Sequence, residues 1–335
     1  MYYKFELITH NIDWTKIEEC PDSTIYKTRE WFDYLKQWKN IDPFIVSVSH
    51  NNQIIGYFVG ECIRKIIKII GSPFEGIGTA HQGLSMFSEC KPDERFEIYS
   101  QLAIWIFKNG YGQFLQIEDW KFDIEDVKSR KVYAQGHKGY MIDLGLSEDE
   151  LFHNLHQKSC RYSINKSIKS GITIRETTDI SAFVDTYYAQ LIEVFAKQGL
   201  KPTYNKDCVR ALVGSLYPDR ILLLEAVTKE GEIAATGLFP GDKNLAIFWG
   251  GASYQKFQKL CPNEPLIWEA IKIWKSRKTK TFDLCGVRPY KLKFGPEVYV
   301  KPRIIFAKYK FLISAKKIAK KLYYGIREFG AKFRK

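Results

Sequence analysis

Apolar positions along segment 221–295 fall into short runs of strand length and one helical stripe. Three apolar runs are separated by the turn-forming segments 229–231 and 241–244, which predicts an antiparallel three-stranded meander. A buried strand over 282–284 is expected before a glycine. Between the meander and this strand, apolar side chains recur at the helical period; they are Leu266, Ile267, Ala270, Ile271 and Trp274. The segment therefore predicts a β-β-β-loop-α-β unit.

The rest of the chain shows a similar order of strands and helices. Hydrophobic periodicity predicts helices over 26–39, 92–109, 180–196 and 205–216, and strands over 112–118, 138–144 and 172–176. A hairpin around 50–52 belongs to the first half. With 335 residues, the chain can form an N-terminal half over 1–145 and a C-terminal half over 146–300. We therefore predict an α/β fold with mixed sheets in two tandem halves.

Ser147 begins a capping-box pattern that predicts one continuous helix over 147–170. Lys158, Arg161 and Asn165 would lie on one stripe of that helix. Guanidinium and ammonium groups complement the oxygens of phosphate. Lys158 and Arg161 are therefore candidate substrate-binding residues for a phosphate or pyrophosphate, and a solvated basic face is the alternative interpretation.

A loop with four glycines follows the apolar run that ends at residue 70. No Gly-Lys-Ser/Thr sequence closes the loop, so the pattern is not that of a P-loop. A set of turns is one interpretation of these glycines. Close approach of the backbone to a ligand is the other, and Glu75 would then offer a carboxylate to the substrate.

The seven cysteines of the chain are scattered, without any Cys-x-x-Cys pair. This distribution favours a reducing compartment and argues against a zinc site. The first residues lack the charged leader and apolar core of a signal peptide, and no apolar run is long enough to span a bilayer. We therefore expect a cytoplasmic protein with no bound metal and no permanently bound cofactor.

The net charge of +13 is concentrated in a tail over 301–335, which carries eleven of the excess positive charges. In that tail, lysines and arginines face one side of a predicted helix and apolar residues the other; the apolar residues are Leu312, Ala315, Ala319, Leu322, Ile326, Phe329 and Phe333. Such a pattern is typical of an interfacial helix on an anionic membrane. We expect 311–335 to hold the protein peripherally at the inner face of the plasma membrane. A helix docked on the protein and an arm that contacts tRNA phosphates are the alternatives.

The order of elements in 221–295 resembles the core of the GNAT acyltransferase fold. Individual residues narrow the resemblance to the Fem-type peptidoglycan-bridge aminoacyltransferase branch; they are Pro262, Leu266, Trp268, Glu269, Ile271, the run 282–286, Tyr290, Lys291, Lys293, Phe294 and Gly295. The resemblance covers roughly residues 30–300. It implies two GNAT-like halves and an enzyme that moves an acyl or aminoacyl group onto an amine or hydroxyl. The implied acceptor is a cell-envelope glycan, peptide or lipid-linked precursor.

Acyl transfer requires a donor carbonyl and an acceptor held in line, a hydrogen-bond donor for the oxyanion and a base for the amine proton. No Gly-x-Ser-x-Gly motif indicates a covalent intermediate. By the resemblance, Lys291 or Lys293 stabilises the oxyanion or a precursor phosphate, and Tyr290 contacts the substrate; the family pattern has one such lysine where this chain has two. Asp283, at a strand end, is the candidate base or positioning carboxylate. Fixing the following turn is its alternative role.

Two aromatic residues stand at the end of the predicted meander. Trp249 and Tyr254 are expected to line a cleft if the sheet edge opens there, and ordinary core packing is the alternative. Glu269 joins the substrate-binding candidates through the resemblance. The expected cleft runs from Trp249 to Lys293.

The segment 255–265 bears on the identity of the acyl donor. Acetyl-CoA users of the GNAT fold hold the pyrophosphate with backbone N–H groups of a glycine-containing loop at a helix start. Here the segment has no glycine and two prolines, and the charge of Glu264 would repel the anion. The expected donor therefore shifts from acyl-CoA toward aminoacyl-tRNA, and both stay open.

Two other functions remain as alternatives. One is an acetyl-CoA-dependent N-acetyltransferase of an amino sugar. The other is a non-catalytic protein of the same fold that binds an envelope precursor. Tight binding of acetyl-CoA would favour the first, and a phenotype that survives loss of Lys291 and Lys293 would favour the second.

Overall fold

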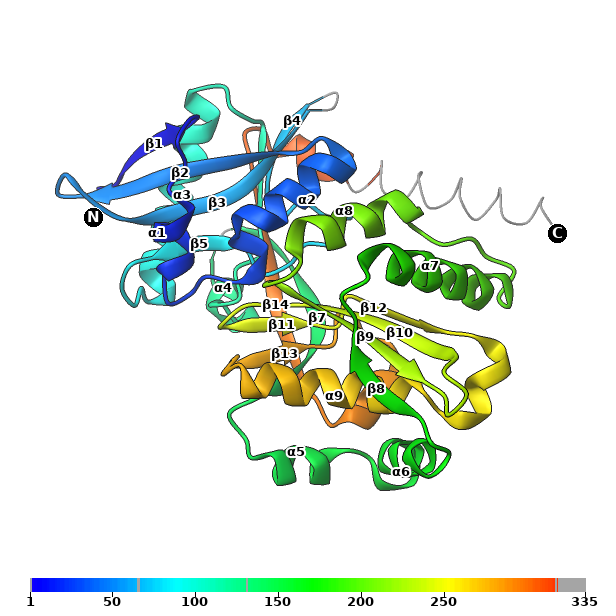
Figure 1. Cartoon of the computed structure of the whole chain (residues 1–335). Helices are drawn as coiled ribbons and strands as arrows, with labels where there is room; N and C mark the ends of the chain where they lie inside the picture. Colours follow the sequence, from blue (N-terminus) through cyan, green and yellow to red (C-terminus); the bar gives the residue numbers. More distant parts are fainter. Residues whose placement is uncertain (1, 65–66, 131, 317, 319–335) are drawn as a thin grey trace. The chain divides into compact units, whose positions relative to one another are not determined.

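The computed structural model describes residues 2–64, 67–130, 132–316 and 318. The chain divides into two compact units (Figure 1). The first unit contains the chain up to Ile12, Pro43–Gln135 and the chain from Pro302, and the second contains Asp13–Asp42 and Gly136–Lys301. Both units combine helices with strands, which confirms the predicted mixed α/β class.

The compact units differ from the contiguous halves that the sequence predicted. Asp13–Asp42 belongs to the second unit, because α2 (Arg29–Lys39) packs against α8 (Lys206–Leu216) there. The chain from Pro302 belongs to the first unit, where the end of β14 (Glu297–Ala307) pairs with β6 (Phe114–Ile117). Packing between distant segments, which sequence periodicity does not report, thus sets the borders of the units.

In the first unit, a sheet with the strand order β1-β2-β3-β4-β6-β14 carries α3 (Pro92–Lys108), and β5 pairs with β3. The remaining strands are β1 (Lys4–Ile8), β2 (Asp42–His50), β3 (Gln53–Arg64), β4 (Lys68–Ser72) and β5 (Gly83–Met86). Ile98, Leu102 and Ile106 lie on one helical face of α3 and are fully buried against the sheet. Strands β4 and β6 are parallel, and the short α4 (Ile124–Lys128) follows β6.

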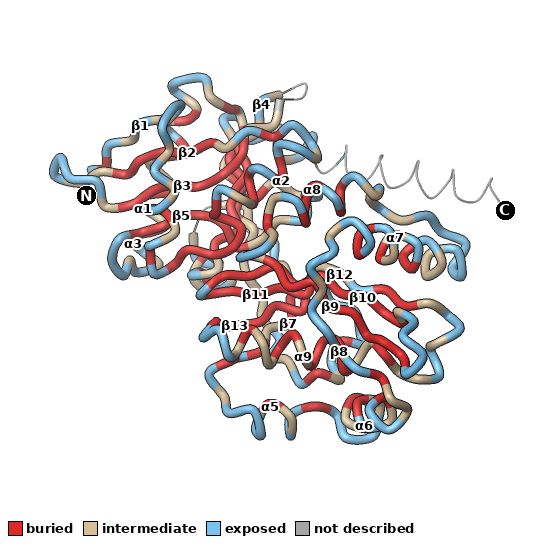
Figure 2. The backbone as a smooth tube through the Cα atoms, viewed as in Figure 1, coloured by how far each residue is buried: buried red, intermediate tan, exposed pale blue. Residues whose placement is uncertain are grey.

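In the second unit, β8 (Thr173–Glu176), β9 (Ile221–Val227), β10 (Ile233–Pro240) and β12 (Gly250–Ser253) form an antiparallel sheet in the order β12-β10-β9-β8. Helices α7 (Ile180–Ala196) and α9 (Asn263–Ser276) cover its opposite faces (Figure 1). Successive strand residues point to opposite faces. Accordingly, the hydroxyl of Thr236 donates to Gln190 of α7 at 2.7 Å, and the next residue, Gly237, faces Leu266 of α9. Strands β9 and β10 are buried along nearly their whole length (Figure 2).

The structure confirms two of the three strands of the predicted meander. Strands β9 and β10 pair antiparallel, but the third apolar run divides into β11 (Leu245–Ile247) and β12. Strand β11 pairs in parallel with β13 (Thr281–Asp283), which also pairs with β7 (Tyr133–Asp143), while β12 pairs with β10. Phe248 and Trp249 connect the two strands, so the chain changes sheets at the point where the sequence predicted an opening.

The predicted continuous helix over 147–170 is wrong, because it is broken at Leu155 and His156. Its capping box at Ser147 is confirmed, and α5 (Glu148–Asn154) follows it. The backbone N–H of His156 then donates to the carbonyl of Lys293 at 2.8 Å, a tertiary contact that draws the chain out of the helix. A π-helical turn, η2 (Gln157–Arg161), leads into α6 (Tyr162–Lys169).

Short helices complete the second unit; they are α1 (Trp14–Glu19), η1 (Ile25–Lys27), η3 (Gln255–Leu260) and η4 (Pro289–Phe294). Among the described residues, no helix has the length and apolar character needed to cross a membrane. The described part of the chain also contains no group of three or more His, Cys, Asp or Glu side chains placed to hold a metal ion. All seven cysteines are free thiols.

Candidate functional site

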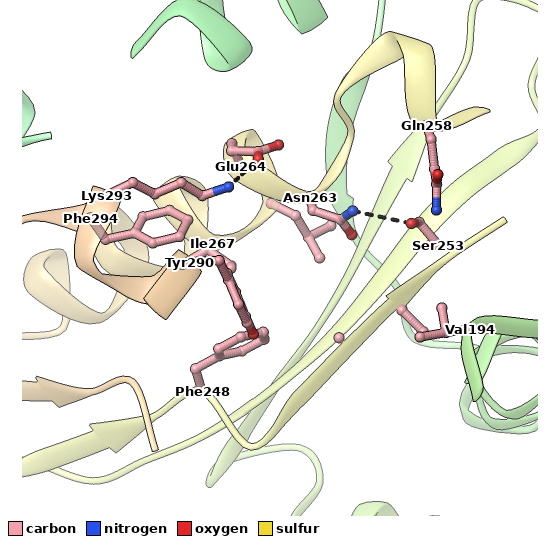
Figure 3. Close-up of a pocket in the computed structure, with 13 residues that line it drawn as sticks. Val194, Phe248, Ser253, Gln258, Asn263, Glu264, Ile267, Tyr290, Lys293 and Phe294 are labelled. Carbon is pink, nitrogen blue, oxygen red and sulfur yellow. Dashed lines mark hydrogen bonds and ion pairs between the residues drawn. The ribbon is translucent and has the colours of Figure 1, made fainter. Parts of the chain in front are cut away.

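A cavity of about 330 Å³ lies in the second unit between β12, the start of α9 and η4 (Figure 3). Its apolar walls consist of Val194, Phe248, Gly251, Ala252, Leu266, Ile267 and Phe294. Its polar lining consists of Ser253, Gln258, Asn263, Glu264, Tyr290 and Lys293. The opening between β12 and β13 creates this space, because the chain changes sheets at Phe248: β11 before it pairs with β13, and β12 after it pairs with β10.

An ion pair between Lys293 and Glu264 projects into the cavity (Figure 3). Glu264 stands in the first turn of α9, and Lys293 stands in the last turn of η4. Their side chains are 14% and 23% exposed, so water screens the pair only in part and the attraction is stronger than on an open surface. The ammonium also lies 5.7 Å from the ring centre of Phe294 and 5.8 Å from that of Tyr290.

A hydrogen bond joins the two other walls of the cavity. The side-chain amide of Asn263 donates to the hydroxyl of Ser253 at 3.1 Å, and thereby links α9 to β12 (Figure 3). These groups give the cavity a neutral polar side, separate from the ion pair. The cavity therefore combines an apolar wall with two kinds of polar contact, which is the composition of a small-molecule site.

Lys291 does not line this cavity, although only one residue separates it from Lys293. Its side chain is buried, and its Nζ donates to the carbonyls of Leu284, at 2.5 Å, and Cys285. Burial lowers the pKa of the Lys291 ammonium, and the nearby Arg288 acts in the same direction. The contacts tie η4 to the turn after β13, so Lys291 holds the wall from which Lys293 projects.

Asp283 is likewise buried and does not line the cavity. Its Oδ1 accepts a hydrogen bond of 2.7 Å from the backbone N–H of Cys285, and its Oδ2 accepts one of 2.9 Å from the hydroxyl of Tyr299. The backbone of Cys285 has a φ of 53°, a left-handed conformation that side-chain bonds of this kind help to fix. The contacts of Asp283 are those of the turn-fixing role that the sequence offered as the alternative.

Of the three aromatic candidates, one lines the cavity and two lie outside its lining. Tyr290 lines the cavity. Trp249 packs its ring 4.9 Å from the ring of Tyr204 and lies outside the lining residues. Tyr254 precedes η3 and also lies outside the lining, although the adjacent Ser253 belongs to it.

Glu269 faces a different cavity, between α6, β8 and α9, and pairs there with Lys272 at 2.7 Å. Lys158 is exposed in η2, and Arg161 is half-buried. Lys158 leaves the stripe that was to join it with Arg161 and Asn165, because the helix is broken at His156 and continues there as a π-helical turn. Arg161, at the start of α6, keeps its helical spacing to Asn165.

Glu75 belongs to the first unit. Its carboxylate lies 3.5 Å from the guanidinium of Arg303, which also binds the buried Glu118 at 2.8 Å. The lining of the 330 Å³ cavity comes from the second unit and does not include Glu75.

Sequence reasoning missed Glu264, Asn263 and Ser253 as members of the site. From the sequence alone, the charge of Glu264 predicts only repulsion of an anion. The structure pairs that charge with Lys293. The pairing becomes visible only when η4 folds back onto the start of α9, and no local pattern signals it.

Comparison with known proteins assigns the fold. Residues 156–296 match the family of acetyltransferase (GNAT) domains, and no curated protein matches the chain. The crystal structure of FemX has 11% sequence identity and a TM-score of 0.69, and the likeness covers 90% of this chain and 96% of that chain.

Two further structures are a domain of a putative lysylphosphatidylglycerol synthetase and a protein named L-PGS. The C-terminal domain of the putative synthetase, from Agrobacterium fabrum, has 11% identity and a TM-score of 0.56, with 92% of this chain and 96% of that chain covered. L-PGS from Bacillus licheniformis has 11% identity and a TM-score of 0.56, with 95% and 98% covered. At these identities, the likeness establishes a shared fold.

The matched region contains β12, α9, β13, η4 and the cavity between them. The chain therefore carries a GNAT acyltransferase domain and is an acyltransferase, which confirms the enzyme class that the sequence predicted. Its architecture is similar to that of FemX along most of the chain. The predicted resemblance to the Fem-type branch is thus confirmed in the fold.

Proposed function

We propose that this acyltransferase moves an acyl or aminoacyl group onto an amine or hydroxyl of a cell-envelope glycan, peptide or lipid-linked precursor, and that the transfer takes place in the 330 Å³ cavity. One observation carries the proposal: the Lys293–Glu264 pair projects into an apolar space at the opening between β12 and β13. The name of the lysylphosphatidylglycerol synthetases describes the joining of an aminoacyl group to a lipid, and FemX belongs to the branch that the sequence resembles.

Lys293 is the proposed hydrogen-bond donor to the reacting carbonyl. The acceptor nitrogen or oxygen attacks the carbonyl carbon, negative charge develops on the carbonyl oxygen, and the bond to the leaving group then breaks. An ammonium in a partly desolvated site stabilises that charge more than water does. Among the lining residues that the structure describes, Glu264 is the carboxylate. It can take the proton of the attacking group and return it to the leaving oxygen or sulfur.

The size of the cavity and its charges favour an aminoacyl donor. A volume of about 330 Å³ lies at the small end of ligand sites, so it suits the transferred group and not a whole carrier. Glu264 can pair with the α-ammonium of an aminoacyl group while Lys293 meets its carbonyl oxygen. The segment before α9 offers no glycine, and Pro262 has no N–H group at the N-cap. A CoA pyrophosphate would therefore find few donors there.

The test is a transfer assay with purified enzyme and envelope precursors, in which aminoacyl-tRNA and acyl-CoA are compared as donors and products are identified by mass spectrometry. Lys293→Ala is expected to lower kcat/KM by roughly a hundredfold or more, as for loss of an oxyanion donor. The exposed Lys201, replaced by alanine, is the matched control. Transfer that persists unchanged in Lys293→Ala would exclude the proposed site. Precursor binding without transfer from any donor would favour the non-catalytic alternative.

We further propose that segment 311–335 attaches the protein peripherally to the inner face of the plasma membrane. Most of this segment, including the predicted apolar stripe from Ala319 onward, lies outside the described residues. In its described part, Phe311 is 66% exposed and Ile318 is 59% exposed, which suits insertion into an interface. Lys316 donates to the side chain of Gln116 at 2.6 Å, so the start of the segment also contacts the first unit.

A further inference from the structure

A second cavity, of about 320 Å³, lies in the second unit between α6, β8 and α9. Its walls are mostly apolar and consist of Phe152, Ile164, Ile168, Ile172, Ile174, Pro265 and Trp268, with Asn165, Glu269 and Lys272 as polar members. Among the described residues, none lines both this cavity and the 330 Å³ cavity. The two cavities use different residues of α9, and the proposed transfer chemistry involves none of the lining of this groove.

Part of the apolar surface of the groove is exposed to solvent and is not packed into the core. Ile164 of α6 is buried in the core, whereas Ile168, one helical turn later, is 61% exposed at the groove. Tyr162 on the same helix is 59% exposed. An apolar groove with an exposed isoleucine at its mouth is the kind of surface that binds an apolar ligand.

The helix that forms one side of the groove is strongly basic. Between residues 157 and 172 the chain has four basic residues and no acidic one. Arg161, Asn165 and Lys169 follow at intervals of four, and the backbone is helical from Arg161 onward. Such residues share one face of a helix. Because Asn165 lines the groove, Arg161 and Lys169 stand beside it on the same face.

Two further details favour an anionic partner. Among the described residues of the lining, Glu269 is the carboxylate, and its charge is already neutralised by Lys272 of the same helix. The Nε of Arg161 is buried and has no hydrogen-bond partner among the described residues. Leaving a buried donor without an acceptor is unfavourable, and a bound oxyanion would supply the acceptor.

We propose that this groove binds an anionic lipid, with one alkyl chain along the isoleucines and the phosphate held by Arg161, Lys169 and Lys272. The chain's own basic C-terminal segment does not fit, since its charges would face a basic rim. The site is separate from the transfer cavity, and its function as a lipid contact does not depend on the identity of the donor or the acceptor.

The test is calorimetric titration of the full-length protein with decyl phosphate below its micellar concentration. Inorganic phosphate has the same charge without the chain, and decyl maltoside has the same chain without the charge. Decyl phosphate is expected to bind at least tenfold more tightly than either probe, since a buried alkyl chain and a charge-assisted contact each contribute about 1.4 kcal/mol or more.

Substitutions at the groove test whether decyl phosphate binds there. Ile168→Asn and Lys169→Glu each are expected to weaken decyl phosphate binding by about tenfold. Ile192→Asn, at an isoleucine of α7 that is 48% exposed, and Lys201→Glu, at an exposed lysine, are the matched controls and should bind normally. Both test positions are exposed, so the variants should fold.

Four results would overturn the proposal: no binding of decyl phosphate, equal binding of decyl maltoside, equal binding of inorganic phosphate, or unchanged binding in Ile168→Asn. The last would place the amphiphile elsewhere, with the basic C-terminal segment as the first alternative. Equal affinity for inorganic phosphate would show an anion site without a chain site, which also contradicts a lipid.

Discussion

The buried ammonium of Lys291 donates a hydrogen bond of 2.5 Å to the carbonyl oxygen of Leu284. Lys293, in the same short helix, instead projects into the cavity and pairs with Glu264 (Figure 3). The two lysines thus have different surroundings, although the sequence offered them as competing candidates. Substitutions at the two positions should therefore have different effects.

We expect Lys291→Met to destabilise the fold by about 2 kcal/mol, because the buried carbonyl of Leu284 and the partly buried carbonyl of Cys285 lose their donor. The loss is measured as the free energy of unfolding in urea. Lys293→Met is the matched variant, and it should cost less stability while it lowers transfer. The prediction fails if Lys291→Met unfolds like the wild type.

Glu264→Gln should change donor selectivity. If the carboxylate pairs with an α-ammonium, its loss should lower kcat/KM for an aminoacyl donor by about tenfold more than for an N-acetylated version of the same donor, since charge-assisted hydrogen bonds contribute about 1.5–3 kcal/mol. The measurement is the ratio of kcat/KM for the two donors in wild type and variant. An equal loss for both donors would indicate that Glu264 acts only through Lys293 or as the proton carrier.

Asp242 should make stability depend on pH. Burial raises the pKa of this carboxyl from 3.8 to about 6, so the folded protein binds the proton more tightly than the unfolded chain. Its contribution to stability is then full below about pH 4 and is lost as the pH rises through about 6.

Asp242→Asn should remove this dependence, because an amide oxygen can still accept from the N–H groups of Asn244 and Leu245. Between pH 4 and pH 7 the free energy of unfolding of the wild type, relative to the variant, should fall by about 2 kcal/mol. Parallel pH profiles of the two proteins would contradict the prediction.

Glu61 in the first unit should also make the stability of the fold decrease as the pH rises, but at a higher pH than Asp242. Burial raises its pKa from 4.5 to about 8; one oxygen accepts from the N–H of Phe74 at 3.1 Å, and the other is buried with no hydrogen-bond partner among the described residues. Stability from this group is full below about pH 4.5 and is lost as the pH rises through about 8.

Between pH 5 and pH 9 the free energy of unfolding of Glu61→Gln, relative to that of the wild type, is therefore expected to rise by about 4 kcal/mol. The measurement is the pair of thermal unfolding curves at each pH. A wild type that loses no stability relative to the variant above pH 8 would show that the carboxylate finds a compensating partner.

Deletion of 311–335 is expected to release the protein from anionic vesicles. Each basic residue near such a surface contributes roughly 1 kcal/mol of binding free energy. The basic residues of this segment together should therefore contribute more to membrane binding than the single lipid groove does. The measurement is co-sedimentation with vesicles that contain phosphatidylglycerol, with neutral phosphatidylcholine vesicles as the control. Unchanged co-sedimentation of the truncated protein would remove the proposed role of the segment.

Helices that depend on local periodicity were predicted nearly to the residue. The stripe over 180–196 became α7, and the one from Leu266 to Trp274 became the buried face of α9. The prediction of one continuous helix over 147–170 is wrong, because a contact with a distant part of the chain breaks it. His156 bonds to Lys293, far along the chain, and a helical pattern carries no information about such a partner.

The sequence by itself determined the mixed α/β class, the resemblance to the Fem-type branch and the two candidate lysines, Lys291 and Lys293, because all three are written in local patterns. It left open which of the two lysines projects into the cavity. Only the tertiary structure decided that Lys291 supports a turn, that Asp283 is occupied by Cys285 and Tyr299, and that Glu264 faces Lys293. These outcomes depend on how β11 and β12 separate and on how η4 returns to α9. Such contacts join residues that are distant in the chain. They determine which partner each buried charged group has.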